Sequence, residues 1–283
     1  MTETIPFFSI VTAVYNGAKY LPDLIESVQS QSFTNYEHII IDDGSTDNGA
    51  TVAILEQYTN ADTRISWWSR ENKGQYATQN EGIEYAKGAY LVCIAADDVV
   101  VSPDALQTIR NAILRNPVDI AYGKTMRMDE NSNPLPDIEL TWRPSTWLIK
   151  HIVYAQHCSV FVKVDFVKQS HLFFDPTYRF AGDWDWIIRL FTATNDIAYI
   201  KTPLSIIRMH TQQTSRTATR QEIMAEHRRV SETYGGSYRL HVIFTQMNNY
   251  RAMILIALDI LRRQGLRAFI TRIKSWVRKR FIH

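Results

Sequence analysis

The sequence predicts an α/β protein with a doubly wound, mostly parallel sheet that is flanked by helices. Short apolar runs rich in β-branched residues alternate with helical patterns over roughly the first 100 residues, as in a chain of β-α units. These runs show no polar alternation, which is typical of strands buried on both faces. Several runs also end in carboxylates, at the edge where ligands of such sheets bind.

The first half of the chain supplies four expected strands, each followed by a helical pattern. The strands are expected at residues 7–15, 37–41, 64–68 and 90–96, and the helices at 18–31, 48–58, 76–86 and 104–115. Right-handed crossovers place the carboxyl ends of these strands at one edge of the sheet. The side chains expected to meet there are Tyr15, Asp42, Asp43, Lys73, Asp97 and Asp98.

The second half of the chain is less regular. Further strands are expected at residues 119–123, 159–162 and 197–200, and a loop or excursion rich in Pro, Asn and Asp at 129–146. Three more helices are expected, one after Gly182 and the others at 221–233 and 251–263.

Asp97 and Asp98, which follow the expected strand at 90–96, form the strongest candidate site. Adjacent ionised carboxylates repel each other, and a hard divalent cation relieves that repulsion while it accepts oxygen ligands. A helix-capping turn is the alternative, because residues 102–104 open a helix. The cap does not account for the two carboxylates. Since the chain lacks the G-x-x-x-x-G-K and G-x-G-x-x-G loops, a nucleotide here would be held by carboxylates and a cation.

A second acidic pair, Asp183 and Asp185, lies with two tryptophans at the start of the helix expected after Gly182. The helix dipole stabilises acids in a first turn, so a purely structural role is open for both. Tryptophans beside a carboxylate also suit a sugar ring, and such a carboxylate can act as a general base. Farther on, His210 could ligate a metal or contact a diphosphate, and Arg208 could pair with a phosphate; simple solvation is the alternative for the histidine.

The bulk composition is that of a soluble globular protein, with 45% hydrophobic and 21% charged residues. The N-terminal residues lack a cationic region and a cleavage site, and no apolar stretch reaches about 18 residues, so neither a secretory signal nor a transmembrane helix is expected. The two cysteines, Cys93 and Cys158, suggest no disulfide framework, which fits a reducing cytoplasm.

Positive charge is concentrated at the C-terminal end, because residues 201–283 hold 16 of the 31 Lys and Arg but 4 of the 29 Asp and Glu. Residues 266–283 place apolar side chains on one helical face and basic ones on the remainder, the pattern of an interfacial membrane helix. Packing of that face on the rest of the protein is the alternative. An anionic membrane surface is favoured, whereas nucleic acid is not, since aromatic stacking platforms are not interleaved.

Five motifs occur in a fixed order: SIVTAVYNG at 9–17, IDDGSTD at 41–47, ENKG at 71–74, AADD at 95–98 and GDWD at 182–185. Together they resemble the inverting nucleotide-sugar glycosyltransferases of glycosyltransferase family 2, of the bacterial surface-polysaccharide type, which have the GT-A fold. The resemblance spans residues 6–215. It implies a catalytic domain at 1–218, with a nucleotide-sugar half at 1–100 and an acceptor half at 101–218, followed by a basic helical extension at 219–283.

The resemblance also implies roles for individual residues. The nucleotide is expected to contact Thr12, Ala13, Tyr15, Asp42, Asp43, Lys73 and Asp97. The cation, Mn²⁺ or Mg²⁺, is expected at Asp97, Asp98 and His210. Asp183 matches the catalytic base, and the acceptor or sugar is expected near His157, Trp184 and Asp185. Two alanines precede Asp97 and Asp98 where an additional Asp is common, so the cation is expected to bind mainly together with the nucleotide.

The implied reaction is a metal-assisted single displacement from a nucleotide sugar, most commonly a UDP-sugar, to a hydroxyl of a glycan or a polyprenyl-diphosphate-linked acceptor. The protein is then expected in the cytoplasm, on the inner face of the cell membrane. Two alternatives stay open. A sugar nucleotidyltransferase would carry a Gly- and Arg-rich phosphate loop after the first strand, where this chain has YNGAKY at 15–20. A non-catalytic nucleotide-sugar-binding scaffold would show no hydrolysis of the donor.

Overall fold

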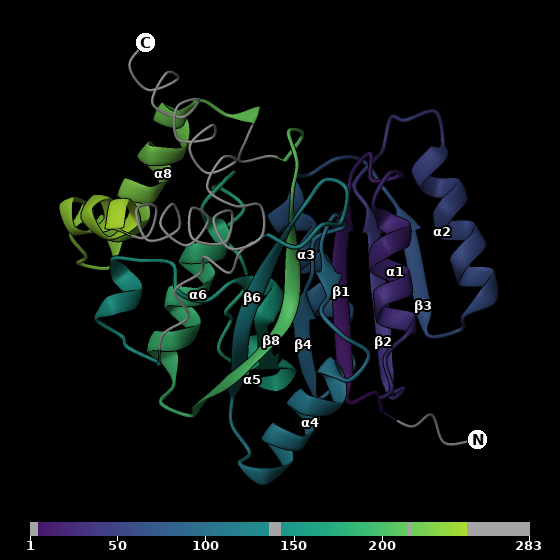
Figure 1. The fold of residues 1–283 in the computed structure, drawn as a ribbon, viewed down its shortest axis with the longest axis horizontal. Coiled ribbons are helices and arrows are strands. Elements are labelled where there is room, and N and C mark those ends of the chain that lie inside the picture. Colours follow the sequence, from purple (N-terminus) through teal and green to yellow (C-terminus); the bar gives the residue numbers. More distant parts are fainter. Residues whose placement is uncertain (1–4, 136–142, 214–216, 248–283) are drawn as a thin grey trace, which may run out of the picture.

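The computed structural model describes residues 5–135, 143–213 and 217–247 of the 283-residue chain. It has one central sheet with helices packed against both faces (Figure 1). The helix expected at 251–263 and the basic segment at 266–283 lie outside the described residues.

In the described part of the chain the sheet has eight strands, in the order β3-β2-β1-β4-β7-β6-β8-β5. They are β1 Phe8–Val14, β2 Tyr36–Asp42, β3 Ile65–Ser69, β4 Tyr90–Cys93, β5 Val99–Val100, β6 Ile120–Asp129, β7 Val160–Lys163 and β8 Ile197–Met209. The first four strands pair in parallel, as do β6 and β8. β7 is antiparallel to both of its neighbours, and β5 is antiparallel to β8. The predicted α/β class with a mostly parallel sheet is confirmed.

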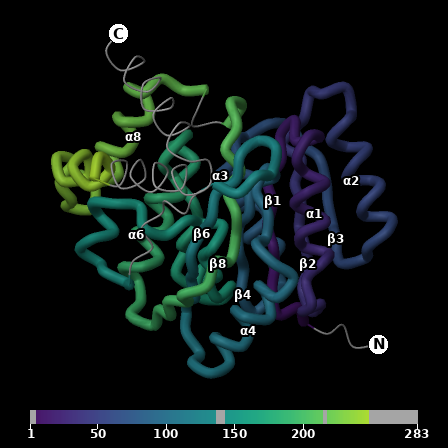
Figure 2. The backbone as a smooth tube through the Cα atoms, viewed as in Figure 1, coloured from purple at the N-terminus to yellow at the C-terminus, as the bar shows by residue number. Residues whose placement is uncertain are grey.

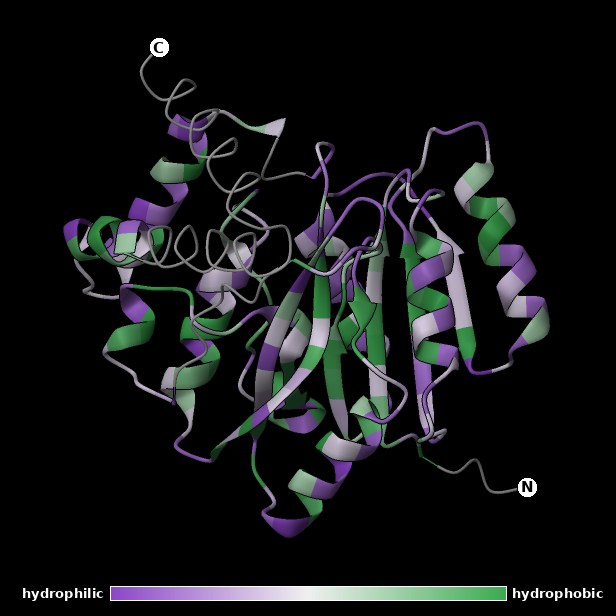
Figure 3. Cartoon of the chain, viewed as in Figure 1, coloured by the Kyte–Doolittle hydropathy of each residue, from purple (hydrophilic) through white to green (hydrophobic). Residues whose placement is uncertain are grey.

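Helices cover both faces of this sheet. They are α1 Leu21–Gln29, α2 Ala50–Ala61, α3 Gln75–Tyr85, α4 Ala105–Arg115, α5 Val164–Gln169, α6 Gly182–Ala193 and α8 Arg220–Thr233, with short 3-10 turns η1 Leu148–Lys150 and η2 His157–Ser159. Consecutive strand residues face opposite layers. Ile10 of β1 packs in the core with α1 and α4, whereas Val11 packs in the core with α3, α5 and α6. Figure 3 shows the resulting apolar strands and the hydrophilic loops at their ends.

The first four strands run in the spatial order 3-2-1-4, so the direction of the chain's progress reverses between β1 and β4 (Figure 2). Loops on either side of such a reversal diverge and leave a crevice at the carboxyl ends of the strands. The fold therefore places the segments after β1, β2, β3 and β4 around one opening, as the sequence predicted.

The strand lengths differ from the prediction in three places. β4 ends at Cys93, four residues before Asp97, whereas β6 and β8 run several residues beyond the expected 119–123 and 197–200. β6 and β8 pair with each other along most of their length, to Asp129 and Met209. Their second halves contain polar residues that weaken the local strand pattern, and the ladder between the two strands stabilises them instead.

α8 begins within a residue of its expected start and ends as expected. Thr219 accepts a hydrogen bond from the Glu222 backbone N–H, and the Glu222 side chain accepts from the Thr219 N–H, which forms a capping box. Val230 of α8 is fully buried in the core that α6 also enters. Within the described residues, no helix has the length and apolar character needed to cross a membrane.

Candidate active site

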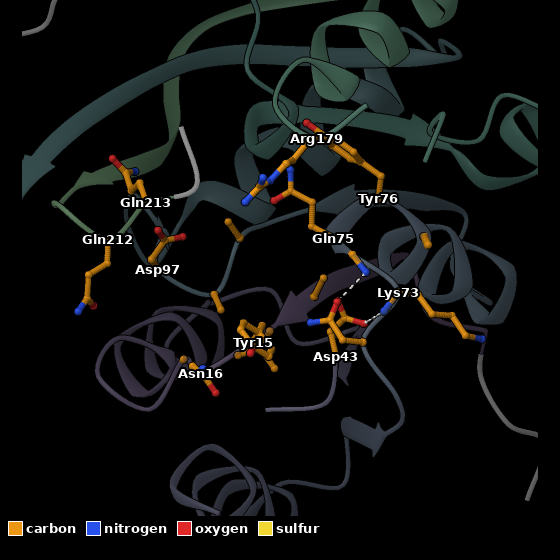
Figure 4. A pocket seen from close by; sticks show the side chains of 18 of the residues that line it. Tyr15, Asn16, Asp43, Lys73, Gln75, Tyr76, Asp97, Arg179, Gln212 and Gln213 are labelled. Carbon is orange, nitrogen blue, oxygen red and sulfur yellow. Dashed lines mark hydrogen bonds between the residues drawn. The ribbon is translucent and has the colours of Figure 1, made fainter. Parts of the chain in front are cut away.

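A cleft of about 690 Å³ opens at the carboxyl ends of the first four strands (Figure 4). It is lined by the loops after β1, β2, β3 and β4, by residues 176–179 before α6, and by His210, Gln212 and Gln213 after β8. Six of the residues predicted from the sequence line this cleft: Ala13, Tyr15, Asp43, Lys73, Asp97 and His210. The remaining predicted site residues do not line it: Thr12, Asp42, Asp98, His157, Asp183, Trp184 and Asp185.

Asp43 is held rigidly at the cleft wall by the loop that follows β3. Its Oδ1 accepts from Arg70 Nη1 at 2.7 Å and from the Lys73 backbone N–H at 2.8 Å. Its Oδ2 accepts from the Gly74 backbone N–H at 2.9 Å. Gly44 lets the two loops approach, since it adopts φ +73° and a Cβ there would lie 2.8 Å from the Arg70 carbonyl oxygen. Lys73 thus meets Asp43 through its backbone rather than its ammonium group.

Two neighbouring predictions fall outside the cleft because their polar groups have partners in the scaffold. The carboxylate of Asp42 is buried and accepts from the hydroxyls of Ser45 and Ser69, which closes the loop after β2. The hydroxyl of Thr12 lies 3.0 Å from His38 Nε2 inside the sheet. Both side chains shape the walls, and neither faces the opening.

Asp97 and His210 form the polar pair on the opposite side of the cleft. His210 Nε2 lies 2.7 Å from Asp97 Oδ2, and 27% of the Asp97 side chain is exposed. His210 itself is nearly buried, with its ring 4.8 Å from that of Tyr20. Its Nδ1 has no hydrogen-bond partner among the described residues.

This pair fits a divalent cation that brings most of its own ligands. Carboxylate oxygen and imidazole nitrogen both suit Mn²⁺, whereas Mg²⁺ prefers oxygen. Within the residues that the structure describes, no three His, Cys, Asp or Glu side chains gather as a metal site would require. A cation held by Asp97 and His210 would need a diphosphate and water to complete its coordination.

Asp98 does not join this pair, in contrast to its expected role as a metal ligand. It is 4% exposed, and its Oδ1 accepts from the Arg208 backbone N–H at 3.0 Å. The Arg208 guanidinium is also committed within the protein, to Asp23 Oδ2, the Asp97 carbonyl and the Ser132 hydroxyl. The expectation that Arg208 pairs with a ligand phosphate is therefore wrong for this arrangement. Asp98 and Arg208 instead tie the end of β8 to the turn that carries Asp97.

Asp183 lies beside the cleft, behind Tyr76. Tyr76 lines the cleft, and its ring packs so closely on Gly182 that a Cβ there would lie 2.6 Å from Tyr76 Cε2. Asp183 Oδ2 lies 3.6 Å from His157 Nδ1, and Oδ1 accepts from the Trp184 backbone N–H. Burial acts to raise the pKa of Asp183, but hydrogen bonding and the charge of His157 outweigh it and hold that pKa below its usual range. The carboxylate is thus ionised at neutral pH.

Trp184 and Asp185 turn away from the cleft into the core. Trp184 is 1% exposed, donates from Nε1 to the Ile149 carbonyl and stacks on His241 at 4.7 Å. Asp185 accepts from Arg189 and from the Tyr234 hydroxyl. Since a helix directs successive side chains about 100° apart, only one of three consecutive residues can face the opening. The structure supports the structural role that the sequence left open for Asp185, and it gives Trp184 no surface for a sugar.

Several cleft residues were not predicted from the sequence. They are Gln75 and Tyr76 at the start of α3, Arg179 before α6, and Gln212 and Gln213 after β8. Each lies within a few residues of a recognised motif or of His210, and that proximity is the one signal that could have indicated them. Their side chains carry amide, phenol and guanidinium groups, which suit the hydroxyls and phosphates of a polar ligand.

The fold and the cleft define an α/β protein with a polar ligand site at the switch point of a parallel sheet. By sequence, residues 9–173 match Glycosyl transferase family 2, and the chain belongs to this family. It is 30% identical over 221 residues to an uncharacterized glycosyltransferase of Rickettsia bellii and 34% identical over 124 residues to glycosyltransferase GlyG of Streptococcus pneumoniae. These matches cover 75% and 44% of the chain but 31% and 40% of the relatives, so the chain spans well under half of their length.

A third relative, an uncharacterized glycosyltransferase of Rickettsia prowazekii, is 26% identical over 97% of both chains. Two solved structures show the same fold. Staphylococcus aureus TarS in complex with UDP-GlcNAc matches with a TM-score of 0.67 and 18% identity, over 80% of this chain and 66% of that one. The mannosyltransferase PcManGT of Pyrobaculum calidifontis, in complex with GDP-Man and Mn²⁺, matches with 0.59 and 13%, over 97% and 81%. The predicted GT-A-like architecture and family are confirmed.

Proposed function

We propose that the protein is an inverting glycosyltransferase that moves a sugar from a nucleoside diphosphate sugar to a hydroxyl of a glycan or lipid-linked acceptor, in the synthesis of a cell-surface polysaccharide. The observation that carries the proposal is the placement of Asp43 and the Asp97–His210 pair on opposite sides of one cleft at the switch point. Nucleotides bind at this point of open parallel sheets.

The nucleoside is assigned to the side of Asp43 and Tyr15. Asp43 Oδ2 accepts one hydrogen bond in the described part of the chain, and a carboxylate oxygen has two lone pairs, so it can accept another from a base N–H. Tyr15 is half exposed in the same cleft and offers a ring face for stacking. UDP and GDP are the first candidates, because structural neighbours of this fold bind UDP-GlcNAc and GDP-Man.

The diphosphate is assigned to the side of Asp97 and His210. A Mn²⁺ or Mg²⁺ ion bound there would stabilise the negative charge on the departing diphosphate. His210 is nearly buried against Tyr20, which restricts its side chain to the rotamer in which Nε2 faces the Asp97 carboxylate. The Arg208 guanidinium donates to the Asp97 backbone carbonyl at 3.0 Å, which fixes the turn that carries this carboxylate.

Asp183 is assigned as the general base. An ionised carboxylate beside the cleft can take the proton of an acceptor hydroxyl as that oxygen attacks the anomeric carbon opposite the leaving diphosphate. His157 is assigned as the partner of Asp183, since its Nδ1 lies 3.6 Å from Oδ2 and both of its ring nitrogens lack hydrogen-bond partners among the described residues. Direct displacement by the acceptor would invert the configuration at that carbon.

A thermal-shift titration tests the assignment of the donor. UDP and GDP would each be titrated with and without Mn²⁺, because a ligand well above its Kd stabilises by about 2 to 4 kcal/mol and raises the melting temperature measurably. We expect a shift with one nucleotide that increases with Mn²⁺. Absence of any shift would overturn the proposal. A shift without slow hydrolysis of the matching nucleotide sugar would favour a non-catalytic binding scaffold instead.

The basic residues 266–283 extend the proposal to cellular location. Their sequence is that of an interfacial amphipathic helix, which would bring the cleft to the anionic inner surface of the membrane. Such a location suits a lipid-linked acceptor. It is a proposal from the sequence pattern, because this segment lies outside the described residues.

A further inference from the structure

The carboxylate of Glu226 on α8 binds the backbone of one wall of the cleft. Glu226 Oε1 accepts from the Arg179 backbone N–H at 2.9 Å, and Oε2 accepts from the N–H groups of Phe180 and Ala181 at 2.8 and 2.9 Å. Three successive backbone donors therefore point at one side chain from another element. Loops form few contacts of their own. These three hydrogen bonds to Glu226 therefore fix the position of the segment before α6.

A second residue of α8 supports the same segment. Arg229 donates to the Thr177 hydroxyl at 2.8 Å, lies 3.5 Å from Asp175 Oδ2 and covers the ring of Tyr178 at 4.1 Å. The loop at 175–181 is thus fastened to α8 at both ends. Residues 176–179 of this loop line the cleft.

Arg179 is the residue of this loop whose side chain the Glu226 contacts direct into the cleft. Its side chain points into the opening (Figure 4), and its backbone is fixed by Glu226. Among the described residues its guanidinium forms no ion pair and contacts the Phe180 ring, at 5.2 Å. Arg70 and Arg208, which lie near the same cleft, are in contrast both bound to carboxylates. The charge of Arg179 contributes to lowering the pKa of Glu222, but no carboxylate among the described residues forms an ion pair with its guanidinium, so its N–H donors are available to a ligand.

We propose that Arg179 binds a phosphate group of the ligand in the cleft, and that Glu226 is the positioning residue that sets the guanidinium there. The proposal rests on the proposed function, since it adds a second positive charge, beside the cation expected at Asp97 and His210, to the phosphate-binding part of the same site. A guanidinium matches phosphate oxygens with two parallel donors, and a fixed backbone lowers the entropy lost on binding.

Two phosphates could supply this ligand. The diphosphate of the nucleotide sugar is the nearer source, because Asp97 and His210 line the same cleft. The phosphate of a prenyl-diphosphate acceptor is the other, since residues 176–179 line the cleft and come shortly before Asp183, the proposed general base, in the chain. Either source would place a phosphate group at Arg179. Binding measurements on Arg179 variants distinguish the nucleotide from the acceptor.

Calorimetric titration of UDP, GDP, uridine and guanosine in Mn²⁺ is the first experiment, on the full chain and on Arg179→Gln, Arg179→Lys and Arg228→Gln. Arg228 is the matched control, because it is an exposed arginine of α8 that does not line the cleft and that, in the described part of the chain, pairs with Glu232 and contacts the Tyr238 ring. For the nucleotide that the full chain binds, we expect Arg179→Gln to raise the Kd of the diphosphate about 10- to 100-fold without changing that of the nucleoside. Arg179→Lys should recover part of the lost affinity, since an ammonium group keeps the charge but lacks the two parallel N–H donors of a guanidinium.

Farnesyl diphosphate, titrated into the nucleotide-saturated protein, tests the second source. Loss of its binding in Arg179→Gln, with nucleotide affinity unchanged, assigns Arg179 to the acceptor phosphate. If Arg179→Gln changes neither ligand, or weakens nucleoside and diphosphate equally, the proposal is overturned. If the unaltered protein binds no nucleotide, the proposed function itself fails, which is a distinct result.

The role of Glu226 is tested by combination with Arg179. Glu226→Ala should weaken binding of the same phosphate ligand, Glu226→Gln should weaken it less because an amide oxygen still accepts, and Glu232→Ala should not change it. In the double variant with Arg179→Gln, the loss from Glu226→Ala should nearly vanish, since it acts through Arg179. Full additivity of the two losses would refute the positioning role.

Discussion

Asp97 Oδ2 and His210 Nε2 lie 2.7 Å apart although 113 residues separate them in the chain. β4 ends before Asp97 and β8 ends just before His210, and the two strands are separated in the sheet by β7 and β6. The hydrogen bond from the Arg208 backbone N–H to Asp98 joins the end of β8 to the turn after β4. Asp98 thus has a structural role, whereas Asp97 faces the cleft.

His210→Asn should remove the imidazole donor from this pair. We expect Mn²⁺-dependent nucleotide binding to weaken by at least about tenfold, because even outer-shell partners of metal ligands contribute that much. Binding without Mn²⁺ should change little. His171→Asn is the matched control, since His171 is exposed and its φ of +53° suits asparagine. Equal binding by both variants with Mn²⁺ would exclude His210 from the cation site.

Asp183→Asn should lower the transfer rate about 100- to 10,000-fold, the contribution of a positioned general base. Nucleotide binding should remain intact, since Asp183 does not line the cleft. The rate is measured as donor-sugar consumption with a fixed acceptor, and binding by calorimetry. Retained turnover with lost binding would refute the assignment.

Asp185→Asn should instead affect stability. Asp185 is 4% exposed at its side chain and accepts from Arg189 and Tyr234, so the substitution removes a charge that a largely buried guanidinium requires. We expect the free energy of unfolding to fall by about 2 to 4 kcal/mol, somewhat discounted because Arg189 is partly exposed. Urea denaturation measures it. An unchanged midpoint would show that the pair contributes nothing to folding.

Stability should fall as the pH is lowered from 6.5 toward 3, in part through His38. Burial lowers the pKa of His38 from 6.5 to about 3, so the folded state holds this ring neutral while the unfolded chain takes up a proton. The unfolded state binds more protons in this window, and each pH unit costs about 1.4 kcal/mol until the folded pKa is reached.

His38→Gln should therefore flatten the pH dependence of the free energy of unfolding between pH 4 and 6, roughly the window set by those two pKa values. Its amide still reaches the Thr12 hydroxyl, which keeps that side chain partnered. His171→Asn, which alters an exposed histidine, should leave the slope unchanged. Parallel slopes for His38→Gln and the unaltered chain would contradict the assignment.

Removal of residues 266–283 should shift the protein from anionic liposomes to the supernatant in a sedimentation assay. A variant in which these residues are scrambled at constant composition is the control, because it keeps the charge and breaks the apolar face. We expect it to bind more weakly than the unaltered chain and more tightly than the truncated one. Unchanged sedimentation on truncation would remove the membrane hypothesis.

The fold class and most of the cleft follow from local patterns. β1, β2 and β4 were predictable because each holds a short run of mostly apolar residues, and Asp43 and Asp97 because each lies close to the end of such a run. The extensions of β6 and β8 were not, since Lys124, Thr125 and Arg127 carry no strand pattern and are stabilised by the ladder between the two strands.

The sequence by itself determined which segments meet at the cleft, since the alternation of strand and helix and the hand of the crossover leave few arrangements. Only the tertiary structure decided which side chains face the opening. Adjacent residues point in different directions, and long-range partners select among them: Arg208 turns Asp98 inward, and Glu226, 47 residues away, places Arg179. Such partners leave no trace in a local pattern, because burial and hydrogen bonding across the fold arise only when distant segments pack together.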